Sequence, residues 1–177
     1  MTLPGDGTIR AMTTTLVLLR HAKSAYPPGV DDHDRPLNAR GRRDAPVAGR
    51  LIAEAVGDID VTLVSTATRA QETFELARPA LLVDRVDNAP GLYLAPAQRM
   101  LAQIRDLQAT TALVVAHNPG TEDLAARLCR EQSSDAYTRM TTKFPTAAFA
   151  VLIADVPFSE WDFGSARLER FEIGRAG

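Results

Sequence analysis

Residues 16–24 read LVLLRHAKS, in which four aliphatic residues lead directly into Arg20 and His21. A short, continuous apolar run of this kind is typical of a β-strand that is covered on both faces. The strand could simply end at the surface, where a charged side chain is solvated. Alternatively, it could point a histidine at an anion, and the rest of the sequence has to decide between these two possibilities.

The composition predicts one globular domain. The chain has 177 residues, of which 45% are hydrophobic, and we expect residues 14–177 to form the domain and residues 1–13 a flexible extension. A net charge of -2 offers no broad basic surface for nucleic acid. No apolar run reaches the roughly 18 residues of a transmembrane helix, and the first twelve residues lack a signal-peptide core. We therefore expect a cytoplasmic protein that does not bind membranes, with Cys129 as a buried, unreactive thiol.

Apolar periodicity predicts alternating strands and helices. Strands are expected at residues 15–19, 60–65, 82–86, 112–116, 147–154 and 166–173, and helices after Asn38, at 68–76, at 100–107 and after residue 120. Pro46 should either delay the start of the first helix to about Asp44 or kink it. The polar residues 131–143 are expected to form a loop. This alternation predicts an α/β fold, with a mostly parallel central sheet and helices on both faces.

Basic side chains follow three of the predicted strands. The first strand ends in Arg20-His21, Arg69 follows the second at the start of a helix, and His117-Asn118-Pro119-Gly120 follows the fourth. In open α/β sheets, ligands bind at the carboxyl ends of the strands, where helix N-termini add positive potential. If these strands are neighbours, two arginines and two histidines gather in one crevice. Guanidinium groups bind phosphate oxygens in pairs, so the expected occupant is a phosphate.

These motifs resemble those of the histidine phosphatase superfamily, which has the phosphoglycerate mutase-like fold. LVLLRHAKS resembles the Arg-His signature, STATRAQET (65–73) the second arginine motif, and VVAHNPG (114–120) the second-histidine motif. The stretch DRPLNARGRRDA (34–45) is similar to the SixA-type phosphohistidine phosphatase branch. The resemblance covers roughly residues 14–130 and implies a three-layer α/β sandwich.

The resemblance also implies a role for each of four residues. His21 corresponds to the nucleophile that becomes phosphorylated, Arg20 and Arg69 to the phosphate clamp, and His117 to the second histidine, which donates a hydrogen bond to the same phosphoryl group. No metal or other cofactor is implied. Phosphoryl transfer needs an in-line nucleophile surrounded by positive donors. We expect one nitrogen of His21 to donate to a fixed acceptor such as a backbone carbonyl, leaving the other free to attack.

The general acid of many family members has no clear counterpart here. Those members carry a carboxylic acid between the second arginine and the second histidine, often as a glutamate directly after a tyrosine. In this chain the segment reads DNAPGLYLAPAQRM (87–100), with Leu94 after the tyrosine. Asp87 and Glu122 are the remaining candidates, although Glu122 also suits the first turn of a helix. A site without an acid would favour phosphohistidine, because imidazole leaves more readily than an alkoxide.

The other candidate residues surround the nucleophile and the loop that follows it. Lys23, Ser24 and Asn118 are candidates for binding phosphate or its carrier. Asp34 and Arg35 are expected at the rim of the site, where they could form an ion pair that holds the loop. His33 lies in the acidic stretch DDHDR, which lacks the ligand spacing of known metal sites.

The sequence therefore predicts a phosphatase that acts on a phosphohistidine-bearing protein through phospho-His21. One alternative is a phosphatase for small phosphomonoesters or nucleotides. A second alternative is a phosphate-sensing or protein-binding module that retains the site without its activity.

Overall fold

The computed structural model describes residues 12–177, so the expected extension at 1–13 lies outside the described residues except for Met12 and Thr13. The strands are β1 (Thr14–Arg20), β2 (Ile59–Val64), β3 (Val83–Asn88), β4 (Thr111–Ala116), β5 (Ala148–Ala154) and β6 (Arg167–Ile173). The α-helices are α1 (Ala39–Val56), α2 (Thr68–Ala77), α3 (Ala97–Arg105), α4 (Gly120–Leu128) and α5 (Asp135–Thr142). Short 3-10 helices are η1 (Asp32–Asp34), η2 (Arg78–Ala80), η3 (Pro90–Leu92) and η4 (Phe158–Glu160).

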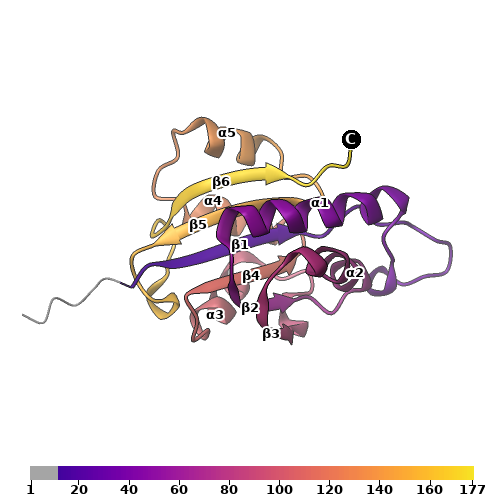
Figure 1. Ribbon diagram of the computed structural model, residues 1–177, viewed down its shortest axis with the longest axis horizontal. Helices are drawn as coiled ribbons and strands as arrows, with labels where there is room; N and C mark the ends of the chain where they lie inside the picture. The colour runs from indigo at the N-terminus through magenta and orange to yellow at the C-terminus, as the bar shows by residue number, and fades with distance from the viewer. Residues whose placement is uncertain (1–11) are drawn as a thin grey trace, which may run out of the picture.

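All six strands form one sheet in the order β3-β2-β4-β1-β5-β6 (Figure 1). β1 pairs with β4 in parallel and with β5 in antiparallel orientation, and β2 lies parallel to both β3 and β4. The aliphatic residues 16–19 thus lie in an interior strand. Both faces of this strand are covered, which explains why successive side chains are apolar. The carboxyl ends of β1, β2 and β4 meet at one edge of the sheet, on the side where the segment between β1 and α1 extends in Figure 1.

Helices cover both faces of the sheet, as the sequence predicts. Val17 and Leu19 of β1 belong to a buried cluster with side chains of α1 and α2, whereas Leu16 and Leu18 belong to a second cluster with side chains of α3 and α4. This alternation follows from the two-residue period of a strand. Each fully buried leucine stabilises the fold by about 1.5–3 kcal/mol relative to an exposed one. The three-layer α/β sandwich is confirmed.

The first helix includes Pro46 and begins well before Asp44. The side chain of Asn38 accepts a hydrogen bond from the backbone N–H of Gly41 at 2.9 Å, and α1 then runs to Val56 with Pro46 inside it. Asn38 is the cap that the sequence predicts, and of the two alternatives for Pro46 the start near Asp44 is wrong. Pro46 has no N–H and therefore removes one backbone hydrogen bond from the helix interior, and the burial of Ala45 and Ala48 on either side helps to keep α1 continuous.

The prediction of a loop at residues 131–143 is also wrong, because this segment contains α5. The side chain of Ser134 accepts a hydrogen bond from Tyr137 N at 3.1 Å, and Asp135 places a negative charge in the first turn. Only Met140 of this helix is buried, so the apolar periodicity is weak. Ser134 was the feature of the sequence that could have indicated this helix, since serine before an acidic first turn is a frequent helix start.

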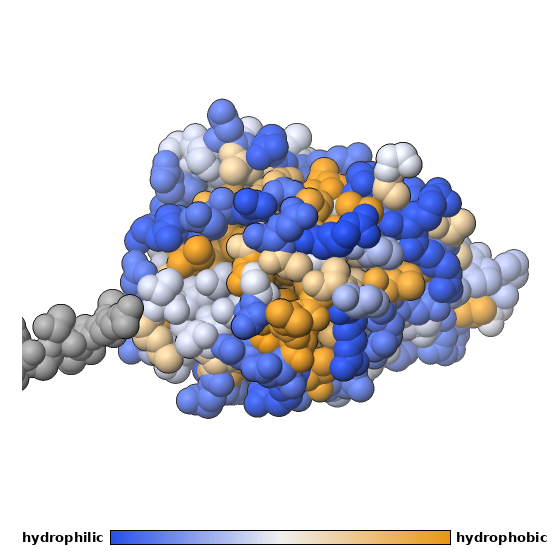
Figure 2. Space-filling view, in the orientation of Figure 1, coloured by the Kyte–Doolittle hydropathy of each residue, from blue (hydrophilic) through white to orange (hydrophobic). Residues whose placement is uncertain are grey.

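The face covered by α1 and α2 is mostly hydrophilic, with hydrophobic side chains gathered near its middle, below α1 (Figure 2). Among the described residues, no helix combines the length and apolar composition that crossing a membrane requires. Cys129 is buried as expected, and burial raises the pKa of its thiol to about 11.

Candidate active site

The structure brings the two predicted histidines together at the carboxyl edge of the sheet. The backbone N–H of His21 donates to the carbonyl of Ala116 at 3.0 Å, which continues the pairing of β1 with β4. The imidazole rings of His21 and His117 lie with their centroids 5.2 Å apart. Both side chains are buried. The neighbouring order of β1 and β4 therefore places residues 96 positions apart at one centre.

The hydrogen bonds of His21 determine which ring nitrogen can attack. Its Nδ1 lies 2.8 Å from the carbonyl oxygen of Ala22, and since a carbonyl only accepts, Nδ1 carries the proton and Nε2 keeps its lone pair. The loop is held in turn by Thr73, whose hydroxyl accepts from Ala22 N at 2.9 Å and donates to the carbonyl of Arg69 at 2.6 Å. Desolvation lowers the pKa of His21 to about 3, so the ring is neutral at physiological pH.

His117 is also held neutral, with one nitrogen available. Its Nε2 lies 2.7 Å from the hydroxyl of Ser65, the residue that follows β2. Among residues 12–177, the buried Nδ1 of His117 has no hydrogen-bond partner. Burial lowers the pKa of His117 to about 4, with a smaller contribution from Arg69. A neutral ring with an unpaired buried nitrogen is suited to binding a ligand oxygen.

The two predicted arginines reach the same centre from β1 and α2. Arg69 is nearly fully buried and donates to the backbone carbonyl of Asp32 at 2.6 Å and to its carboxylate at 3.1 Å. Arg20 donates to the carbonyl of Phe144 at 2.7 Å, and its buried Nε has no partner among the described residues. Both lower the pKa of His21. The arrangement can stabilise negative charge beside the free Nε2 of His21.

Asp32 and Tyr93 belong to the centre although the sequence did not single them out as functional. The Tyr93 hydroxyl donates to the carboxylate of Asp32 at 2.6 Å, and the Tyr93 ring packs edge-on against His117 with centroids 5.6 Å apart. The Tyr93 hydrogen bond, assisted by Arg35 and Arg69, lowers the pKa of Asp32 to about 2. The stretch DDHD (31–34) contains three aspartates in four positions. Which of them reaches Arg69 and Tyr93 depends on the path of the loop, which the sequence does not reveal.

The expected ion pair between Asp34 and Arg35 does not form. The carboxylate of Asp34 lies 3.2 Å from Nδ1 of His33, and this side chain is 69% exposed. Arg35 instead pairs with Asp32 at 2.7 Å, donates to the carbonyl of Ala25 at 3.0 Å and also bonds the hydroxyl of Ser24. Arg35 does hold the loop, through a different carboxylate, because η1 turns Asp34 toward solvent.

The remaining predicted residues occupy different positions around the centre. Ser24 is buried against Arg35, and Lys23 lines a cavity beside Arg20. Asn118 gives its amide hydrogens to Glu122 and to the carbonyl of Phe144, both at 3.1 Å. Its contact with phosphate stays a prediction that would require one of these bonds to open.

The two candidate acids lie apart from each other. Glu122 accepts from Asn118 in the first turn of α4, and its charge opposes the lowering of the Arg20 pKa by burial. Asp87 lies on the edge strand β3, where it pairs with Arg85 at 3.0 Å. No contact brings Asp87 to His21 or His117.

The close approach of two backbones explains the glycine in HNPG. A Cβ atom on Gly120 would lie 2.0 Å from the carbonyl oxygen of Ala95. Glycine thus lets the start of α4 pack directly against the segment that follows Tyr93. Among residues 12–177, no group of three or more histidine, cysteine, aspartate or glutamate side chains is arranged to hold a metal ion.

The two lowered histidine pKa values predict an acid-dependent loss of stability. Unfolded histidine has a pKa near 6.5, so between pH 6.5 and about 4 the unfolded chain binds protons that the native His21 and His117 exclude. The free energy of unfolding is therefore unaffected by the titration of these two histidines above pH 6.5. Below that pH it falls, by up to about 1.4 kcal/mol per pH unit for each histidine. Urea unfolding from pH 7 to 4.5 should show this slope. His21→Asn and His117→Asn should each flatten this slope. The comparison variant His33→Asn, at a 41% exposed side chain that makes only a minor contribution to the lowered pKa of His117, should flatten it least. Equal slopes in all four proteins would contradict this account.

Comparison with known proteins identifies relatives along most of the chain. Residues 16–92 match the model of the histidine phosphatase superfamily (branch 1). An uncharacterised protein of Mycobacterium tuberculosis is 39% identical over 163 residues, which cover 89% of this chain and 100% of that relative. A solved structure of a candidate phosphohistidine phosphatase SixA from Nakamurella multipartitia is 29% identical with a TM-score of 0.83, covering 93% of this chain and 98% of the other. The protein histidine phosphatase SixA complexed with tungstate shares the fold, with a TM-score of 0.74, 22% identity and 91% and 97% coverage.

Proposed function

This chain belongs to the histidine phosphatase superfamily, branch 1, and on that premise we propose that it hydrolyses protein phosphohistidine through a covalent phospho-His21 intermediate. The four core residues Arg20, His21, Arg69 and His117 lie in one centre, and His21 has the neutral, directed imidazole that attack on phosphorus needs. The likeness to SixA structures supports the choice of substrate class.

The proposed reaction has two displacements at phosphorus. The lone pair of His21 Nε2 forms a bond to the phosphorus while the bond from phosphorus to the substrate imidazole breaks. The leaving nitrogen keeps that electron pair and takes a proton from water. A second water then attacks the phosphorus of phospho-His21 while the bond from phosphorus to Nε2 breaks and returns its electron pair to Nε2. The proton that this water releases neutralises the hydroxide left by the first step, and inorganic phosphate leaves. Arg20, Arg69 and His117 would stabilise the charge on the equatorial oxygens in both steps.

The donors around the carboxylate of Asp32 are the observation that carries the choice of phosphohistidine, since this carboxylate accepts hydrogen bonds from Tyr93, Arg35 and Arg69. Asp32 is the carboxyl group that contacts Arg69, and its pKa of about 2 leaves it without a proton to donate at neutral pH. The other two candidates, Asp87 and Glu122, are engaged by Arg85 and Asn118. General acid catalysis contributes about 10²–10⁴-fold where a leaving group needs it. A site without an acid therefore favours substrates that leave as imidazole or phenolate.

Side-by-side hydrolysis of three substrates tests this proposal. The substrates are a histidine-phosphorylated protein, an aryl phosphate and an alkyl phosphate. We expect the alkyl phosphate to have a kcat/KM at least about 10²-fold below that of the other two, because only alkoxide departure needs an acid. Glu122→Gln and Asp87→Asn should retain hydrolysis of the phosphohistidine protein within about threefold, as each removes a carboxylate without changing its size.

Two results would point to the alternative functions. A preference for alkyl phosphates that disappears in Glu122→Gln would identify a small-molecule phosphomonoesterase with a working acid. Binding of tungstate or phosphate with no turnover of any substrate would identify a phosphate-sensing module.

A further inference from the structure

A basic cavity lies beside the catalytic centre. It has a volume of about 310 Å³, and its charged lining consists of Arg20, Lys23, Arg40, Lys143 and Arg175. Pro145 and Thr146 complete the wall, and no acidic side chain contributes to it. These five cations come from β1, the following loop, α1, the end of α5 and the C-terminal segment. The fold therefore gathers them from parts of the chain that are distant in sequence.

Most of these charges lack a partner within the protein. Only Arg40 forms an ion pair with a carboxylate, at 3.3 Å from Asp44, among the ion pairs that residues 12–177 make. Arg20 bonds a backbone carbonyl, and within the same range Lys23, Lys143 and Arg175 have no side-chain hydrogen bond. Like charges that converge on one cavity repel one another, and a bound anion relieves that repulsion. The cavity is thus suited to an anionic group.

The cavity borders the catalytic centre at Arg20. Arg20 lines its wall and also lowers the pKa of His21, and Lys23 follows His21 by two residues. A substrate with its phosphoryl group at His21 can therefore place a second anionic group here. Because Arg20 borders both positions, one substrate molecule can place a group at each of them.

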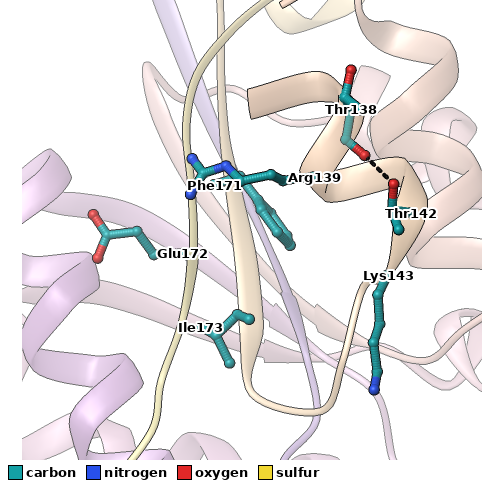
Figure 3. A pocket seen from close by; sticks show the side chains of 7 residues that line it. All are labelled: Thr138, Arg139, Thr142, Lys143, Phe171, Glu172 and Ile173. Atoms are coloured by element: carbon teal, nitrogen blue, oxygen red, sulfur yellow. Dashed lines mark hydrogen bonds between the residues drawn. The ribbon is translucent and has the colours of Figure 1, made fainter. Parts of the chain in front are cut away.

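The neighbouring groove indicates that this substrate is a protein. Lys143 lines both the basic cavity and a groove of about 540 Å³ between α5 and β6. Phe171 and Ile173 project from β6 toward α5 in this groove, whereas Glu172 points to the other side (Figure 3). The combined surface of charge and apolar groove extends well beyond the reach of a small phosphomonoester. It suits an acidic side chain presented by a protein surface.

We propose that the basic cavity binds an acidic side chain that flanks the phosphohistidine in the substrate protein, an inference that rests on the proposed function. Two synthetic histidine peptides, phosphorylated with phosphoramidate, provide the test. They differ only in having glutamate or glutamine at the flanking positions. We expect the wild type to prefer the glutamate peptide about five- to tenfold in kcat/KM, from a few partly exposed ion pairs, and to lose the preference at high salt.

Matched variants separate the cavity from net charge. Lys143→Gln combined with Arg175→Gln should abolish the preference and leave aryl phosphate hydrolysis unchanged. Arg50→Gln combined with Arg99→Gln removes the same two charges from exposed positions and should keep the preference. Arg50 lies ten residues beyond Arg40 in α1, about 15 Å away by helical rise.

Each other outcome overturns the inference in a recognisable way. If the wild type hydrolyses both peptides equally, the subsite is absent while the proposed function stands. If it hydrolyses aryl phosphate but neither peptide, the proposed function itself fails. If the peptides are equal but hydrolysis of propanediol bisphosphate depends on Lys143 and Arg175, the cavity serves a small anion and not a protein.

Discussion

His21→Ala is expected to abolish hydrolysis of both a phosphohistidine protein and an aryl phosphate, with a loss of at least about 10³-fold in kcat. The substitution removes the imidazole that we propose attacks phosphorus. Its Nδ1 donates to the carbonyl oxygen of Ala22 at 2.8 Å, which leaves the lone pair on Nε2. Burial keeps this ring neutral with a pKa of about 3, so Nε2 is nucleophilic throughout the physiological pH range. Nε2 of His117 is engaged by Ser65, and we assign its Nδ1, which has no partner among the described residues, to a hydrogen bond with the phosphoryl group and not to attack on phosphorus.

Rapid quenching with a ³²P-labelled substrate distinguishes the nucleophile from a residue that only binds. Wild type should carry acid-labile, alkali-stable label on the protein, and His21→Ala should carry none. Cys129→Ser is the matched control, because it removes the thiol, which is another group that could form a covalent intermediate. Cys129 is buried, with a thiol pKa of about 11, and the variant should retain full activity and labelling. Labelling of His21→Ala at the wild-type level would overturn the mechanism.

Arg69→Lys is expected to lower kcat by about 10²–10³-fold, the effect of losing one preorganised donor to a developing charge. Lysine keeps the positive charge but lacks the planar fork that contacts two oxygens at once. The nearly complete burial of Arg69 also removes water from the interaction and strengthens it. The Kd of tungstate, measured by calorimetry, should rise in parallel.

Asp32→Asn shows whether Arg69 acts on the phosphoryl group or only holds the loop. Arg69 donates to the backbone carbonyl of Asp32 at 2.6 Å as well as to its carboxylate at 3.1 Å. The backbone bond survives in Asp32→Asn, so we expect a loss of about tenfold or less. If Asp32→Asn and Arg69→Lys are equally impaired, and both have the same melting temperature as wild type, Arg69 acts only through the loop.

The fold could be predicted because its interior strands are mostly apolar, and runs of apolar residues are a local property of the sequence. β1, β2 and β4 are interior strands whose residues are mostly buried on both faces. β1 and β4 appear in the sequence as short aliphatic runs, and β2 as β-branched and aliphatic residues interrupted by Asp60. α5 escaped prediction because it buries only Met140 and depends on the Ser134 cap. The sequence identified the cap at Asn38 but left two alternatives for Pro46, and the structure excludes the start near Asp44 because α1 already begins at Ala39.

The sequence by itself determined which residues follow the strand ends, namely Arg20-His21, Ser65 and His117, because chain order and apolar runs are local properties. Tertiary structure decided the rest. The path of the β1–α1 loop selected Asp32 over Asp34 as the partner of Arg69 and Arg35, and η3 brought Tyr93 to the same carboxylate. The C-terminal segment and the end of α5 added Arg175 and Lys143 to the basic cavity. Such partners depend on distances of a few ångströms between segments far apart in the chain, and no periodicity in the sequence encodes them.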